Sequence, residues 1–159
     1  EDFKERGAIK TDLEELLAQA DFVSIHCPFN EETKDMIDRA ELALMQPSAF
    51  LVNCSRGGIA NEDAMTEALE DKQIRGIGLD VWVVEPPAMD HPLLKFDNLI
   101  ATYHTAGVTV ESRTNMSAWN AEQMGEVLHG KRPERLINPE AWDKFCDRYE
   151  ALFGERPEG

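Results

Sequence analysis

Short apolar runs separated by helix-forming segments are the feature that most constrains the fold of this chain. Four runs bounded by turn residues have the pattern of strands: residues 21–26, 50–53, 74–81 and 98–103. Segments with helical spacing of apolar side chains lie between them: one or two short helices are expected over 31–46 and one helix over 62–71. Strands that alternate with helices in this way form βαβ units and pair in a parallel sheet. We therefore predict an α/β domain with a doubly wound parallel sheet, in which the run 50–53 is buried on both faces.

Polar capping residues mark where the helices of this domain begin. Thr11, with Glu14 three residues later, has the pattern of a capping box ahead of a short helix over 11–17. Asn61 is expected to cap the helix over 62–71. The residues of that helix expected to point inward are Ala64, Met65, Ala68 and Leu69.

A long helix is predicted after residue 108. Thr109 or Ser112 is expected to cap its start, and Gly130 to follow its last residue, His129. Aromatic residues at steps of three and four predict a further short helix near the end of the sequence. These residues are Trp142, Phe145, Tyr149 and Phe153.

The charge of the chain limits its partners. Its 159 residues carry a formal net charge of −15, from 31 acidic and 16 basic side chains. Affinity for nucleic acid comes mainly from lysine and arginine that neutralise phosphates, so nucleic acid is not an expected partner. No apolar run approaches the roughly 20 residues of a membrane helix, and no signal-peptide pattern is present. We expect a cytoplasmic protein with no membrane partner.

The cysteines and histidines do not have the spacing of metal ligands. Cys27, Cys54 and Cys146 form no CxxC pair, and the four histidines include no HxxxH pattern. We therefore expect no metal site. Because Cys27 and Cys54 lie in apolar runs, both are expected to be small buried hydrophobic residues.

Polar groups at the ends of three predicted strands are expected to share one edge of the sheet. Arg56 follows the second strand, Glu85 lies in the loop after the third, and His104 ends the fourth. Ligands of open α/β sheets bind outside the carboxyl ends of the strands. A guanidinium fits a carboxylate with two hydrogen bonds, and a histidine beside a carboxylate is suited to general acid–base work. Each residue alone is more often structural; together they predict a site that holds an anion and moves a proton.

Several longer motifs occur in one order along nearly the whole chain. They are HCPFNEET (26–33), LVNCSRGGIANEDAMTEALEDKQIRGIGLDVWVVEPP (51–87) and DHPLLKFDNLIATYHTAG (90–107). Over residues 7–153 the chain thereby resembles the D-isomer-specific 2-hydroxyacid dehydrogenases, which include phosphoglycerate dehydrogenase and glyoxylate/hydroxypyruvate reductase. The resemblance implies an oxidoreductase that interconverts a small D-2-hydroxy acid and a 2-oxo acid with NAD or NADP. It also implies a homodimer.

The resemblance assigns a role to each member of the predicted site. It implies that Arg56 binds the carboxylate and carbonyl of the substrate, that His104 is the general acid/base, and that Glu85 is the partner of His104. The residues that it places near the cofactor are Cys27, Pro28, Thr33, Cys54, Ser55, Arg56, Asp80, His104, Ala106 and Gly107.

The sequence departs from the family pattern by an absence. No GxGxxG occurs in the chain, although the family has this phosphate-binding turn upstream of the motifs matched here. We therefore expect a Rossmann-like nucleotide-binding domain without its first βαβ unit over residues 1–108. Residues 109–159 are expected to form a connecting helix and a C-terminal piece of the substrate domain. Such a chain is expected to be inactive alone, to bind NAD weakly, and to self-associate through unpaired strand edges.

Two alternatives share the predicted fold. Formate dehydrogenases have a similar architecture, but they use glutamine where this chain has Glu85. Dehydrogenase-like transcriptional corepressors keep similar motifs as nucleotide-sensing, dimerising modules without catalysis. The identity of the 2-hydroxy acid and the choice between NAD and NADP stay open.

Overall fold

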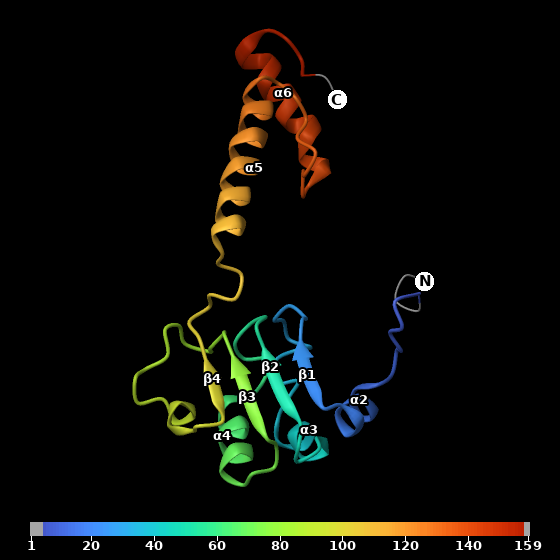
Figure 1. Ribbon diagram of the computed structural model, residues 1–159. Coiled ribbons are helices and arrows are strands. Elements are labelled where there is room, and N and C mark those ends of the chain that lie inside the picture. Colours follow the sequence, from blue (N-terminus) through green and yellow to red (C-terminus); the bar gives the residue numbers. More distant parts are fainter. Residues whose placement is uncertain (1–4, 158–159) are drawn as a thin grey trace. The chain divides into compact units, whose positions relative to one another are not determined.

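The computed structural model describes residues 5–157 and divides into two compact units, Glu1–Ala106 and Gly107–Gly159 (Figure 1). The first unit contains a sheet of four strands, all paired in parallel in the order β1-β2-β3-β4. The strands are β1 (Phe22–Ile25), β2 (Phe50–Asn53), β3 (Gly76–Leu79) and β4 (Leu99–Ala101). The predicted parallel α/β sheet is confirmed. The opening residues 1–4 of the predicted first domain lie outside the described residues.

Helices precede and join the strands, and one of them, η1, lies in a segment for which the sequence predicted only a loop. They are α2 (Leu13–Gln19), α3 (Arg39–Leu44), α4 (Glu62–Glu70) and a short 3₁₀ helix, η1 (Pro92–Lys95). Asn61 caps α4, because its side chain accepts a hydrogen bond from the Ala64 N–H at 3.0 Å. All four residues of α4 predicted to point inward are buried. Both predictions for this helix are confirmed.

The predicted start of the first helix is wrong in detail, whereas the one or two short helices predicted within 31–46 are confirmed as one short helix. The cap of α2 is Asp12, which accepts from the Glu15 N–H at 2.9 Å; aspartate is a stronger N-cap than threonine, so the helix begins one residue later than Thr11 predicts. The region 31–46 forms one helix, and its first part is a series of turns. There the Asn30 side chain accepts from two backbone N–H groups, which competes with helix formation.

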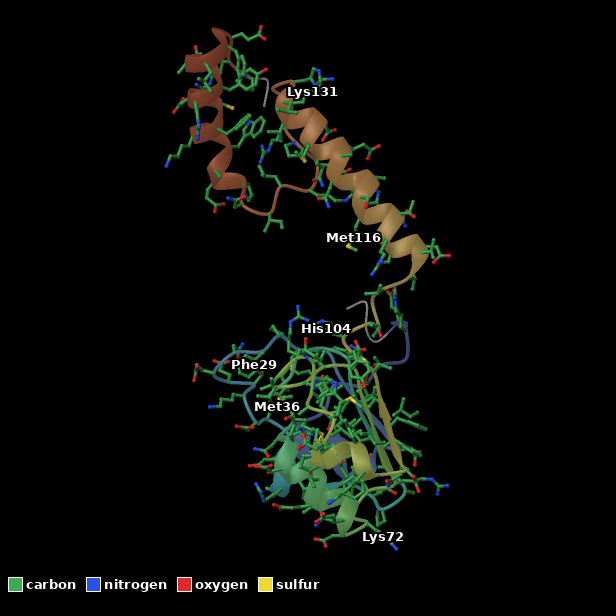
Figure 2. All side chains as sticks on the ribbon, turned by 90° about the vertical axis from the view of Figure 1, so that its left-hand side faces the viewer. Phe29, Met36, Lys72, His104, Met116 and Lys131 are labelled. Carbon is green, nitrogen blue, oxygen red and sulfur yellow. The ribbon has the colours of Figure 1, made fainter. Side chains whose placement is uncertain are left out.

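One face of the sheet carries the hydrophobic core. Alternate strand residues such as Val23 and Leu51 are buried against the helices, which lie together on this face (Figure 2). On the opposite face Phe22 stacks on Phe50 at 5.3 Å between ring centroids, but Phe22 remains 70% exposed. The prediction that β2 is buried on both faces is therefore wrong for the described residues of this unit. A sheet with a single layer of helices buries only every second strand residue.

The second unit is a pair of helices. Thr109 caps α5 (Val110–Leu128) by accepting from the Ser112 N–H at 3.0 Å, and Gly130 follows the C-cap residue His129 with φ of 68°. After the 3₁₀ helix η2 (Pro139–Ala141) comes α6 (Trp142–Phe153), along which the four predicted aromatic rings contact one another in series. Within residues 5–157, none of the helices has the length and apolar character needed to cross a bilayer.

Close approach of two backbones at Gly76 yields a stability prediction. A Cβ added there would lie 2.7 Å from the carbonyl oxygen of Asn98, which also accepts the Ile77 N–H between β3 and β4. Gly76→Ala is therefore expected to lower the free energy of unfolding by about 1–3 kcal/mol, the usual range for overpacking. At Gly78 the nearest atoms are the Val52 methyl groups at 3.8 Å, so Gly78→Ala is the matched control with little loss. Urea unfolding measures both, and equal midpoints for the two variants would contradict the prediction.

Candidate active site

The parallel register places the ends of three strands in one row. Asn53 of β2 pairs with Leu79 of β3, which pairs with Ala101 of β4. The segments that follow these strands therefore leave the sheet at the same edge. Figure 2 shows His104 and Phe29 at this end of the first unit and Lys72 at the opposite end. The predicted site residues of the first unit thus follow strands that end at a common edge.

Asn53 shapes the turn that presents Arg56. Its buried side chain donates to the Arg56 carbonyl at 2.9 Å and accepts from the N–H and hydroxyl of Ser55 at 3.0 and 2.8 Å. The Arg56 side chain is exposed, and its Nη1 donates to the Ser55 carbonyl at 2.6 Å. No carboxylate among the described residues pairs with it. The guanidinium is therefore held at the sheet edge with donors left for an anion.

His104 and Glu85 form the pair that the sequence predicts. The Nδ1 of His104 lies 2.8 Å from Oε2 of Glu85, and both side chains are partly exposed. The second oxygen of Glu85 accepts from the Trp82 N–H at 3.0 Å. The hydrogen bond from His104, followed by the one from Trp82, holds the pKa of the Glu85 carboxyl below its ordinary value. The carboxylate therefore stays ionised beside the imidazole, and Nε2 is the ring nitrogen left to exchange a proton.

Asp80 supports the turn that carries His104. Its buried carboxylate accepts from the N–H groups of Thr105 and Ala106 at 2.7 and 2.9 Å and from the Thr102 hydroxyl. Burial by itself raises the pKa of the Asp80 carboxyl, but these three hydrogen bonds outweigh it and hold the pKa below the ordinary value. His104 has φ of 56°, in the left-handed region that is costly for a residue with a Cβ. The bonds to Asp80 on both sides of it stabilise that conformation.

Gly57 brings the Arg56 turn against the loop that carries Glu85. A Cβ added at Gly57 would lie 2.0 Å from the Trp82 carbonyl oxygen. Only glycine therefore allows the two backbones to approach this closely. The Trp82 ring is buried, and its Nε1 donates to the Thr102 carbonyl at 2.9 Å. Through Trp82, the segments that follow β2, β3 and β4 are in direct contact.

A cavity of about 620 Å³ lies at the same edge, and its walls include residues predicted to bind the cofactor. It is lined by His26, Cys27, Pro28, Phe29, Ser55 and Arg56. Its volume is in the range of small-molecule sites. The prediction missed His26 and Phe29, although both adjoin predicted residues in the HCPF motif. The size of the cavity and the cation in its wall are compatible with part of an anionic dinucleotide.

The other predicted cofactor residues have different positions. The Thr33 hydroxyl donates to the Pro28 carbonyl at 2.7 Å, so Thr33 supports the cavity loop from outside the lining. Cys54 is exposed and Cys27 half-buried, which corrects the expectation that both are buried hydrophobic residues, because each follows a strand at the open edge. Gly107 belongs to the second unit, and its part in the site stays a prediction. In the described part of the chain, no group of three potential ligands could hold a metal ion.

Residues 1–106 match the family model of the D-isomer specific 2-hydroxyacid dehydrogenase NAD binding domain. This chain belongs to that family. The family resemblance and the Rossmann-like class of the partial sheet are thereby confirmed. The division of the chain into part of a nucleotide-binding domain over 1–108 and a piece of the substrate domain within 109–159 stays a prediction.

Relatives from bacteria and archaea align with most of the chain. A glyoxylate/hydroxypyruvate reductase B from Pectobacterium carotovorum is 43% identical over 129 residues, which is 81% of this chain and 40% of the relative. A D-3-phosphoglycerate dehydrogenase from Methanocaldococcus jannaschii is 42% identical over 127 residues, 80% of this chain and 24% of the relative. The chain thus spans less than half the length of these two relatives.

Solved structures of 2-hydroxyacid dehydrogenases have a fold similar to that of this chain. A 2-hydroxyacid dehydrogenase from Polaromonas sp. is 34% identical, with a TM-score of 0.78 over 84% of this chain and 42% of that one. The NAD-complexed enzyme from Lactobacillus delbrueckii ssp. bulgaricus is 31% identical, with a TM-score of 0.72 over 80% of this chain and 43% of that one.

The lowered pKa of Glu85 predicts that the stability of the folded chain depends on pH. A carboxyl whose pKa is lowered by folding stabilises the folded chain at and above its unfolded pKa, about 4.3 for glutamate, and loses this contribution as the pH falls through the folded pKa. The side-chain carboxyl carbon of Glu85 is therefore expected to titrate at a lower pH in the folded chain than in the urea-unfolded chain, as an NMR pH series measures. His104→Ala removes the largest cause and is expected to raise that midpoint. An unchanged midpoint in this variant would contradict the assigned cause.

Proposed function

We propose that this chain provides the acid–base and substrate-binding residues of an NAD-dependent 2-hydroxyacid dehydrogenase. The observation that carries the proposal is the His104–Glu85 hydrogen bond at 2.8 Å, in contact through Trp82 and Gly57 with the turn that presents Arg56. A cation and an imidazole–carboxylate pair are the groups that binding a 2-oxo acid and protonating its carbonyl oxygen require. The corepressor-like alternative requires neither group to act on a substrate.

Each residue of the site has a definite task in this reaction. Arg56 binds the substrate carboxylate through its exposed guanidinium, and the buried Asn53 holds its turn. Glu85 orients the imidazole through Nδ1, which leaves Nε2 of His104 to donate a proton to the substrate oxygen in reduction and to accept it in oxidation. When bound, the nicotinamide supplies or accepts the hydride at the substrate carbon. Asp80 keeps the His104 turn in place.

The cavity beside Arg56 is the proposed place for part of the cofactor. Its lining comes from the segment that follows β1, with His26, Cys27, Pro28 and Phe29, and from the segment that follows β2, with Ser55 and Arg56. We propose NAD as the cofactor, because the matched model describes an NAD binding domain and structural relatives include NAD complexes. NADP is the alternative, since one relative is described in complex with NADPH. Assays with both cofactors distinguish them.

The proposed substrates and assembly follow from the relatives. Those named above include enzymes described as acting on glyoxylate, hydroxypyruvate and phosphoglycerate. We propose a small 2-hydroxy or 2-oxo acid of this class as the substrate and a homodimer as the active form. A cytoplasmic location remains part of the proposal.

Turnover by the protein in its natural length, encoded with any sequence that precedes Glu1 in its gene, tests the proposal. With glyoxylate or hydroxypyruvate and NADH, His104→Ala is expected to lower kcat by about 10²–10⁴-fold, the usual contribution of general acid–base catalysis. Arg56→Ala is expected to lower kcat/KM chiefly through a higher KM for the 2-oxo acid.

Matched controls come from an arginine and a histidine that are not among the predicted site residues. Arg75 precedes β3 and lies at the other end of the sheet, and His129 is the C-cap of α5. Arg75→Ala and His129→Ala are expected to keep wild-type turnover. Wild-type turnover in His104→Ala or Arg56→Ala would overturn the assigned roles. Nucleotide-dependent dimerisation without turnover of any 2-hydroxy or 2-oxo acid would favour the corepressor-like alternative.

A further inference from the structure

A second carboxylate holds the loop that carries Glu85. Glu62 is the first residue of α4, and its Oε1 accepts the N–H of Val83 at 2.8 Å. The preceding N–H, that of Trp82, donates to Glu85 at 3.0 Å. Two successive amides of one loop are therefore bound by two different carboxylates. The carboxylate of Glu62 belongs to helix α4, and the carboxylate of Glu85 is the hydrogen-bond partner of His104.

His91 fixes the second oxygen of Glu62. Its Nε2 lies 3.3 Å from Glu62 Oε2, and both side chains are only 19% exposed. Because His91 Nδ1 accepts the Leu93 N–H at 3.3 Å, the neutral ring carries its proton on Nε2 and donates it to Glu62. The ring also packs edge-on against Trp82 at 5.2 Å between centroids. Glu62 therefore binds the Val83 N–H, and His91 contacts both Glu62 and the Trp82 ring.

The position of Glu62 at the start of α4 suits it to hold the Val83 N–H in place. The N-terminus of a helix favours a negative charge, and Asn61 caps α4 immediately before it. The carboxylate is tied to a rigid helix, whereas Val83 and Glu85 belong to an exposed loop. Without Glu62, the Val83 N–H loses its acceptor and the peptide between Trp82 and Val83 is free to rotate. That rotation would also displace the Trp82 carbonyl, against which Gly57 packs.

We propose that Glu62, supported by His91, is a positioning residue for the Glu85–His104 pair. It acts through the Trp82–Val83 peptide and touches no reacting atom. Its effect on catalysis rests on the proposed function, whereas its effect on the loop does not. The test therefore has a structural measurement and a kinetic one.

Amide hydrogen exchange and the His104 ring signal, both observed by NMR on the full chain, provide the structural measurement. In Glu62→Ala the amides of Val83 and Trp82 are expected to exchange at least about tenfold faster, because hydrogen-bonded amides exchange only through opening. The Hε1 resonance of His104 is expected to move toward its position in Glu85→Ala. Glu62→Gln keeps an acceptor oxygen and is expected to restore most of the protection. Faster exchange at Val83 alone, with Trp82 and His104 unchanged, would overturn the proposal.

Asp63→Ala is the matched control. Asp63 is the next residue of α4, is exposed, and also places a negative charge in the first turn. Its removal tests whether charge at the helix start explains the effect, and it is expected to change neither exchange nor the His104 signal. An effect of Asp63→Ala equal to that of Glu62→Ala would overturn the proposal.

The kinetic measurement uses the protein in its natural length. Glu62→Ala is expected to lower kcat about tenfold with little change in KM for the cofactor, and Glu62→Gln to recover most of the loss. Unchanged kcat in Glu62→Ala, with an active wild type, would overturn the catalytic part of the proposal. Absence of turnover in the wild type would instead refute the proposed function and leave the exchange result to decide the role of Glu62 in the loop.

Discussion

The parallel register of β2, β3 and β4 is the constraint on which the site depends. Parallel pairing brings the C-terminal ends of the strands to one edge of the sheet. Here it sets the last residues of the three strands, Asn53, Leu79 and Ala101, side by side. Gly76 permits the close approach at the other end of β3. A shift of one residue in this register would turn the buried residues of a strand to the opposite face. The hydrophobic core on the helix side therefore also fixes the positions from which Arg56 and His104 leave the sheet.

Buried polar side chains convert this row of strand ends into a defined site. Asn53 and Asp80 are both at most 2% exposed, and each binds the turn that follows a strand end. An unsatisfied buried polar group costs about 1–3 kcal/mol, so each of these side chains strongly favours the single turn conformation that satisfies it. Rigid turns then carry the exposed residues. In the candidate site, the exposed side chains of Arg56 and His104 are therefore carried by turns that the buried side chains of Asn53 and Asp80 hold in place.

Local signals in the sequence predicted the local parts of the fold. Asn61 and Thr109 cap helices because their side chains bond N–H groups three residues ahead, and the buried face of α4 follows from its spacing alone. Contacts between distant residues were not predictable in this way. The contacts of Val83 with Glu62 and of Gly57 with Trp82 join segments that follow β2 and β3, so they depend on the pairing of these two strands. The one-sided burial of β2 likewise depends on which faces the helices cover, which the composition of a four-residue strand does not specify. The meeting of Glu85 and His104 at one edge was predicted from the strand ends, and the motif resemblance added the role of each residue.

Charge explains why Arg56 has to act at short range. The chain has a formal net charge of −15, so its overall field repels the anionic substrate that we propose. At physiological ionic strength, however, this field is screened beyond about 8 Å, and the free energy of a bidentate contact depends on geometry at hydrogen-bond distance. Arg56 has no described carboxylate partner; the Asn53 side chain donates to its carbonyl, and its Nη1 donates to the Ser55 carbonyl. Its remaining donors therefore stay available in an otherwise acidic chain. Selectivity for a carboxylate substrate then rests on local positioning of the guanidinium rather than on steering by the whole molecule.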